Sequence, residues 1–118
     1  MTEAERAGGE ETIRLTLFVA ANSYASTVAA ENLQNAVRRH DPGAFAVEIV
    51  DVFVVPRRLL RDGILVTPTL VAQDLGQRVV GDLSNASLLE YFLQSLLKIR
   101  SERNVPGDDD RRADRVTP

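Results

Sequence analysis

The chain has 118 residues, 44% hydrophobic and 26% charged, which is the size and composition of one globular domain. It has no cysteine, which excludes disulfide bonds, thiol redox chemistry and thiolate metal sites, and its single histidine argues against a histidine-based metal site or triad. The net charge is −3, but residues 12–100 hold eight acidic and nine basic residues, so we expect no nucleic-acid binding by bulk electrostatics.

Both ends of the sequence lack apolar periodicity. We expect residues 1–11, which are acidic, and residues 101–118, which surround the Asp108–Asp110 run, to be disordered tails of a domain at residues 12–100. The Asp run favours solubility over a docking motif. The first residues are acidic where a signal peptide is basic and then apolar, and no apolar run is long enough to span a bilayer. The sequence therefore predicts a cytoplasmic protein with no membrane partner.

The first half of the chain predicts a strand, a helix and a strand. Residues 13–19 carry Ile, Leu, Leu and Val at every second position, which is typical of a strand with one buried face. We expect Ser26 or a neighbour to cap the helix that follows, and Arg38, Arg39 and His40 to occupy its last turn, where cations suit the helix dipole. Residues 45–51 alternate again and predict the second strand.

The second half predicts a short helix, a hairpin and a long helix. Pro56 suits the first turn of a helix that continues over residues 57–62 and ends at Gly63. Residues 69–72 and 78–80 predict two strands joined by a compact turn, and therefore a hairpin. Residues 81–85 interrupt the sheet, Ser84 or Asn85 caps the last helix, and that helix ends near Arg100.

This order of elements favours one fold class. Two crossover connections followed by a hairpin and a closing helix predict an α/β fold of the thioredoxin-like βαβαββα type, with a mixed four-stranded sheet and helices on both faces. Pro68 precedes the third strand, where a residue without an N–H is tolerated, and thioredoxin-like domains carry a proline there. We expect its peptide bond to be cis.

Several segments occur in an order and at a spacing that carry a family resemblance. They are Leu17-Phe18-Val19-Ala20-Ala21-Asn22, Val50-Asp51-Val52, Pro56, Asp62, Ile64-Leu65, Thr67-Pro68-Thr69-Leu70 and Val80-Gly81-Asp82-Leu83-Ser84-Asn85. Together they resemble the KaiB family of circadian-clock proteins over about residues 12–100. The last of these segments resembles the most specific signature of the family.

The resemblance implies a non-enzymatic regulator that needs no cofactor. KaiB proteins exist as a tetrameric ground-state fold and as a monomeric thioredoxin-like fold, and the latter docks on the ring-shaped ATPase KaiC. Related thioredoxin-like domains are sensor modules of histidine kinases that dock on the same ATPase. The implied partner is thus a KaiC-type ATPase, or a histidine kinase or other signalling protein. The implied alternatives are the ground-state fold, and a dimer or tetramer in place of a monomer.

The sequence departs from the family pattern in three places. A turn centred on Gly76 replaces a longer segment with a proline cluster, and Phe92 stands where typical members carry a glycine. Both changes favour the thioredoxin-like fold, because glycine weakens a helix interior and a buried phenylalanine adds hydrophobic stabilisation. The short helix is basic here, whereas in clock members it is mixed or acidic.

Two sets of residues are the candidate functional positions. We expect the first set to contact the protein partner: Asp51, Pro56, Arg57, Arg58, Arg61 and Asp62. The second set shapes or switches the fold: Asn22, Thr67, Pro68, Thr69, Gly81, Asp82, Ser84 and Asn85. The arginines of the first set can engage an acidic partner surface, and a merely solvated face is the alternative. For Pro68 the alternative to a structural role is an isomerisation switch.

A rival interpretation comes from the turn before the first helix. Asn22, Ser23, Tyr24 and Ser26 occupy the place where thioredoxins carry their cysteines, and a helix N-terminus can bind an anion. The rival is a cysteine-free glutathione-binding or transferase-like protein. Serine and asparagine are also ordinary cap and turn residues, and no partner base is evident, so we expect no catalysis.

Overall fold

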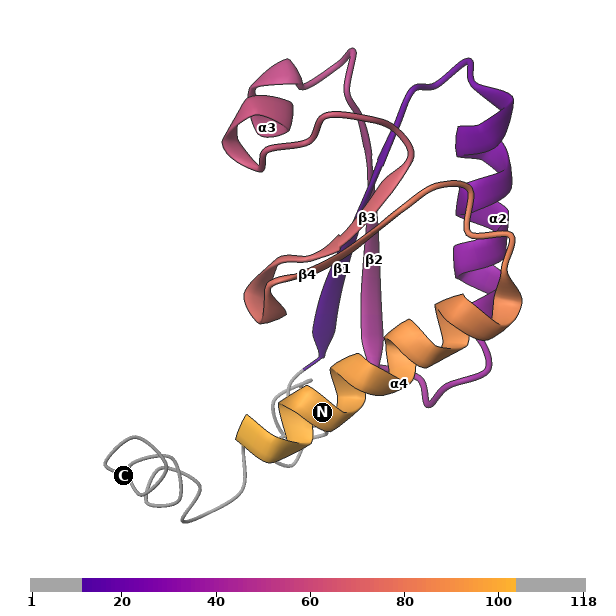
Figure 1. Cartoon of the computed structure of the whole chain (residues 1–118), viewed down its shortest axis with the longest axis vertical. Coiled ribbons are helices and arrows are strands. Elements are labelled where there is room, and N and C mark those ends of the chain that lie inside the picture. The colour runs from indigo at the N-terminus through magenta and orange to yellow at the C-terminus, as the bar shows by residue number, and fades with distance from the viewer. Residues whose placement is uncertain (1–11, 104–118) are drawn as a thin grey trace.

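A mixed four-stranded sheet forms the centre of the structure, a computed structural model that describes residues 12–103 (Figure 1). The strand order is β2-β1-β3-β4. β1 pairs with β2 in parallel and with β3 antiparallel, and β3 and β4 form the predicted antiparallel hairpin. The strands are β1 (Ile13–Val19), β2 (Phe45–Asp51), β3 (Thr69–Ala72) and β4 (Gln77–Val80).

Helices cover both faces of this sheet, which confirms the predicted fold class. α2 and α4 share one face, where Leu33, Phe92 and Leu93 belong to one buried cluster with β1 residues. α3 lies on the other face, where Leu59 packs against a smaller cluster that contains Phe18. The helices are α2 (Tyr24–Val37), α3 (Pro56–Arg61), the 3-10 turn η1 (Gln73–Leu75) and α4 (Ala86–Arg103). No helix within residues 12–103 is long and apolar enough to cross a bilayer.

Two features of the sheet differ from the expectation. The connection from β2 through α3 leads to β3, which runs antiparallel to β1, so only β1-α2-β2 is a parallel crossover unit and the second expected crossover was wrong. β1 is also buried on both faces, since Phe18 is fully buried and Thr16 is 8% exposed. A central strand covered by helices on both faces does not show the alternation of buried and exposed residues that a strand with one solvent-exposed face shows.

The ends of α2 are shifted from the predicted positions. Ser23 is the N-cap, because its side-chain oxygen accepts a hydrogen bond from the N–H of Ser26 at 3.2 Å. The helix ends at Val37, so Arg38 is its C-cap and Arg39 and His40 follow the helix instead of occupying its last turn.

α4 begins at a side-chain cap and extends farther than predicted. Asn85 is the cap, since its Oδ1 accepts a hydrogen bond from the N–H of Leu88 at 3.0 Å. The helix continues to Arg103, three residues beyond the expected end at Arg100. Residues 101–103, expected to be disordered, belong to this helix, so the expected start of the C-terminal tail was wrong. The rest of the two expected tails, residues 1–11 and 104–118, lies outside the described residues.

Phe92 contributes to the main core, and its neighbour Tyr91 does not. Phe92 is 9% exposed and Tyr91 is 71% exposed. We expect Phe92→Ala to lower the free energy of unfolding by about 3–5 kcal/mol, because it leaves a cavity in the layer between α2 and α4. Tyr91→Ala is the matched control and is expected to change it by less than about 0.5 kcal/mol. Urea unfolding followed by circular dichroism measures both, and equal effects would contradict the assignment of Phe92 to the core.

Candidate functional site

The predicted partner-binding residues lie in the segment between β2 and β3, around α3 (Figure 1). Asp51 turns the chain after β2: its Oδ1 accepts a hydrogen bond from Phe53 N at 2.9 Å, and its carbonyl accepts from Val54 N and Val55 N at 2.9 and 3.1 Å. Pro56 is the first residue of α3. A backbone N–H at this position has no acceptor within the helix, so a proline there costs no hydrogen bond. Asp51 and Pro56 therefore fix the course of this segment.

Large apolar side chains are exposed on α3 and on both loops beside it. Phe53 and Val54 are 76% and 72% exposed before α3, Leu60 is 82% exposed on it, and Leu65 is 94% exposed after it. These four residues are called the apolar patch below. Several exposed large apolar side chains within one short segment of the chain are typical of an interaction surface.

The apolar patch was not predicted from the sequence, although one signal for it was present. Leu59 and Leu60 are neighbours on a six-residue helix. Neighbouring residues lie about 100° apart around a helix axis, so a short helix on a sheet buries only one of such a pair. Leu59 packs against the sheet, and Leu60 faces solvent.

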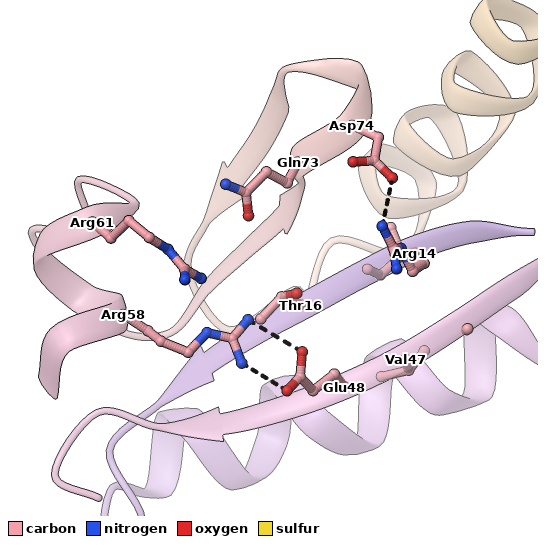
Figure 2. A pocket seen from close by; sticks show the side chains of 10 residues that line it. Arg14, Thr16, Val47, Glu48, Arg58, Arg61, Gln73 and Asp74 are labelled. Carbon is pink, nitrogen blue, oxygen red and sulfur yellow. Dashed lines mark hydrogen bonds and ion pairs between the residues drawn. The ribbon is translucent and has the colours of Figure 1, made fainter. Parts of the chain in front are cut away.

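Arg58 attaches α3 to β2. Its Nη1 and Nη2 donate to the carboxylate of Glu48 at 2.7 and 3.2 Å (Figure 2), and its guanidinium carbon lies 5.8 Å from the centre of the Phe18 ring. The hydrogen bond from Arg58 lowers the pKa of Glu48, and the same bond raises the pKa of Arg58. The Arg58 side chain is 25% exposed. Arg58 is therefore a structural contact, and it is less exposed than the other two arginines of the predicted basic cluster, Arg57 and Arg61.

Asp62, one of the residues expected to contact the partner, is buried. Its side chain is 1% exposed, and its Oδ1 accepts hydrogen bonds from Arg61 Nε at 3.2 Å and Gln73 Nε2 at 3.0 Å. Burial raises the pKa of this carboxyl, but the two donors and the nearby arginines outweigh it, so the pKa is lowered. Arg78 on β4 donates to the carbonyls of Asp62 and Gly63 at 2.9 and 3.1 Å. The C-terminal end of α3 is thereby attached to β4 and η1.

Two arginines of the predicted cluster keep their charge at the surface. Arg57 is exposed, and its side chain makes no hydrogen bond or ion pair with another described residue. The Arg61 side chain is 63% exposed although its Nε binds Asp62. The surface around α3 thus combines the apolar patch with the positive charges of Arg57 and Arg61.

The two sequence motifs that carry the predicted switch residues are hydrogen-bonded to each other. Gly81 N donates to Pro68 O at 2.9 Å, so the start of β3 and the end of β4 are joined beyond the hairpin ladder. The Thr67–Pro68 peptide bond is cis, the isomer expected from the sequence. Thr69 is 2% exposed and its hydroxyl donates to Val66 O at 2.7 Å.

The remaining switch residues make local contacts in turns. The Asp82 carboxylate accepts from Ser84 N at 3.0 Å, and hydrogen bonds from Ser84 lower the pKa of Asp82. The Asp82 carbonyl accepts from Asn32 on α2 at 3.0 Å. Leu83, between Asp82 and Ser84 in the sequence, is buried and has a φ of 63°. This left-handed conformation is uncommon for a non-glycine residue. Asn22 is exposed in the turn before α2.

The serine hydroxyls at the start of α2 also have structural partners. Ser23 caps the helix, and Ser26, which is 3% exposed, accepts a hydrogen bond from Ala20 N at 3.0 Å. Within residues 12–103 no group of three or more His, Cys, Asp or Glu side chains is placed to hold a metal ion.

Comparison with known proteins identifies the family of this chain. The KaiB domain model matches residues 16–95. The chain belongs to the KaiB family. The circadian clock oscillator protein KaiB of Thermosynechococcus vestitus is 38% identical over 102 residues, which is 85% of this chain and 92% of that protein. KaiB3 of Synechocystis sp. is 37% identical over 75 residues, which is 62% of this chain and 74% of that protein. KaiB proteins are clock regulators and not enzymes, as predicted.

Solved structures share the fold of this KaiB-family chain. The N-terminal domain of Synechococcus elongatus SasA gives a TM-score of 0.60 at 21% identity, covering 75% of this chain and 86% of that domain. Chloroplastic thioredoxin z gives a TM-score of 0.63 at 20% identity, covering 81% of this chain and 88% of that protein. These similarities confirm the thioredoxin-like arrangement.

The buried carboxylate of Asp62 makes a prediction about stability. We expect Asp62→Asn to lower the free energy of unfolding at pH 7 by about 1–3 kcal/mol, because the amide cannot replace the charged acceptor of Arg61 and Gln73. Asp41→Asn, at an exposed aspartate, is the matched control and is expected to have little effect. Urea unfolding measures both.

The same variant tests the pH dependence. The folded pKa of Asp62 lies below the usual value of 3.8, so its contribution is complete above pH 3.8 and is lost as the pH falls below it. The difference in stability between the wild-type protein and Asp62→Asn should therefore shrink as the pH falls below 3.8. A difference that stays constant into strong acid would contradict the lowered pKa.

Proposed function

We propose that this chain is a non-enzymatic cytoplasmic regulator of the KaiB type that docks on a KaiC-type ATPase through α3 and the two loops beside it. The observation that supports this most is the apolar patch, since its side chains are 72–94% exposed on one short segment. Single exposed apolar residues are common, but four within the thirteen consecutive positions 53–65 favour a partner that covers them.

The contacts beneath α3 suit a docking surface. Arg58 joins α3 to β2, while Arg61, Gln73 and Arg78 hold Asp62 and the backbone at the end of the helix. A surface that is held in its binding geometry loses less conformational entropy on association. The polar contacts below α3 thus support the role of the apolar patch above it.

The surface also indicates the chemistry of its partner. The apolar patch favours an apolar surface, and Arg57 and Arg61 favour carboxylates beside it. In this proposal the thioredoxin-like fold of residues 12–103 is the docking form, and the chain binds as a monomer.

Leu60 tests the apolar part of the surface. We expect Leu60→Ser to raise the Kd for the KaiC-type ATPase roughly 10- to 100-fold, since burying a leucine side chain contributes about 1.5–3 kcal/mol. Tyr91→Ser is the matched control, because Tyr91 is also exposed but lies on α4, on the opposite side of the sheet. Isothermal titration calorimetry measures both Kd values. An unchanged Kd for Leu60→Ser would place the interface elsewhere.

Arg57 tests the electrostatic part. We expect Arg57→Glu to slow association with the ATPase by about tenfold at low salt, and by much less in 1 M NaCl, where charges are screened within about 3 Å. Lys98→Glu reverses an exposed charge on α4 and serves as the control. Stopped-flow or surface plasmon resonance measurements give the association rates. Equal rates for the two variants would show that Arg57 is only a solvated side chain.

A histidine kinase is the second candidate partner. The similarity to the N-terminal domain of SasA, with a TM-score of 0.60, favours a place in two-component signalling as well as in a clock. The wild-type chain and Leu60→Ser are each used to capture proteins from native lysate. The protein that only the wild-type chain retains shows whether the partner is the ATPase or the kinase.

A further inference from the structure

β4 is an edge strand with one unpaired side. The strand order is β2-β1-β3-β4, so β4 pairs with β3 and with no other strand among residues 12–103. Three of its four residues, Gln77, Arg78 and Val80, are exposed. The outer side of an edge strand carries backbone N–H and C=O groups that can pair with a further strand.

The register of the hairpin shows which backbone groups of β4 point away from β3. Gly81 N donates to Pro68 O at 2.9 Å, and the two residues lie opposite each other when the β3–β4 register is extended by one position. Hydrogen-bonded and non-hydrogen-bonded pairs alternate along an antiparallel ladder, so Val79 bonds to β3, whereas Arg78 and Val80 do not. The N–H and C=O groups of Arg78 and Val80 therefore point outward from the sheet edge.

The side chains of β4 leave this edge open to pairing. Edge strands are usually protected by charged side chains, prolines or bulges. The one charged side chain of β4 belongs to Arg78, and it donates to the carbonyls of Asp62 and Gly63 at 2.9 and 3.1 Å. Because this guanidinium is held against the end of α3, it does not protect the outer side of β4.

Val80 continues the apolar patch to this edge. Val66 follows Leu65 of the patch and is 50% exposed, and Val80 is 59% exposed. The Val66 carbonyl accepts the hydroxyl of Thr69 at 2.7 Å, and Thr69 lies opposite Val80 in the hairpin. The side chains of such a pair are neighbours on one face of the sheet, with Cβ atoms about 5 Å apart. Exposed apolar side chains thus extend from Leu65 through Val66 to Val80.

We propose that β4 binds an extended segment of the protein partner, which adds to the sheet as a fifth strand. This inference rests on the proposed docking through α3, because the apolar patch and the open edge form one continuous surface. The occupant is an uncharged segment that pairs with the outward backbone groups of Arg78 and Val80 and places an apolar side chain on Val66 and Val80. Main-chain hydrogen bonds supply affinity in this mode of recognition, and side-chain contacts supply specificity.

Hydrogen exchange of the full chain, with and without the KaiC-type ATPase, tests the pairing directly. In the free chain we expect the outward N–H groups of Arg78 and Val80 to exchange quickly, since β3 does not bond them. In the complex both amides should exchange at least tenfold more slowly, together with amides of α3. Mass spectrometry of peptides that cover residues 77–80 measures this protection, and it needs no variant.

Two variants of Val80 separate the backbone donor from the side chain. Val80→Pro removes one outward N–H, and proline is tolerated where an edge-strand N–H faces solvent. Val80→Ala is the matched control, because it shortens the side chain and keeps the N–H. We expect the Kd for the ATPase to be roughly tenfold higher for Val80→Pro than for Val80→Ala. Isothermal titration calorimetry measures both values, and circular dichroism checks that both variants are folded.

The outcomes separate this inference from the proposed function. If Leu60→Ser weakens binding but the exchange of β4 is unchanged in the complex, the strand pairing is wrong and docking through α3 stands. Equal Kd values for folded Val80→Pro and Val80→Ala would have the same meaning. An unchanged Kd for Leu60→Ser would overturn both proposals. Protection of β4 that grows with the concentration of the free chain would also overturn the inference, because a second copy would then be the occupant.

Discussion

The polar attachment of α3 to the sheet is the interaction on which the proposed docking surface depends. α3 has no buried residue of its own, and only Leu59 packs against the smaller apolar cluster. Its position is set by the Arg58–Glu48 pair at 2.7 Å and by the buried carboxylate of Asp62. Removing a donor to the buried Asp62 carboxylate leaves that charge with one partner fewer, which costs more than the hydrogen bond contributes.

Much of the fold was predictable because it follows from local signals. Apolar periodicity located the strands, Pro56 and Gly63 marked the ends of α3, and the residues around Gly76 indicated the hairpin turn. These signals act within a few positions of the chain. The helix caps were predicted less well, since Ser23 and Ser26 are chemically equivalent and only the backbone of the completed turn decides which one caps α2.

The candidate site was predictable in its location and not in its chemistry. The basic helix and the segment from Asp51 to Asp62 were found from the sequence, but the different roles of its three arginines were not. Arg58 meets Glu48 ten positions away across two elements, and Asp62 meets Gln73 eleven positions away on the far side of β3 in the sequence. Such contacts depend on tertiary structure. For this reason neighbouring arginines of α3 have different roles, one in a structural contact and the others as surface charges.

The outward-facing residues of α3 are independent of the contacts that hold it. Leu60 and Arg57 have little to do with the packing beneath them, whereas Arg58 and Asp62 carry it. Substitutions at the two outward positions therefore leave stability nearly intact, as is usual for solvent-facing sites. Related chains can in this way diverge in the protein they recognise while the scaffold is inherited unchanged.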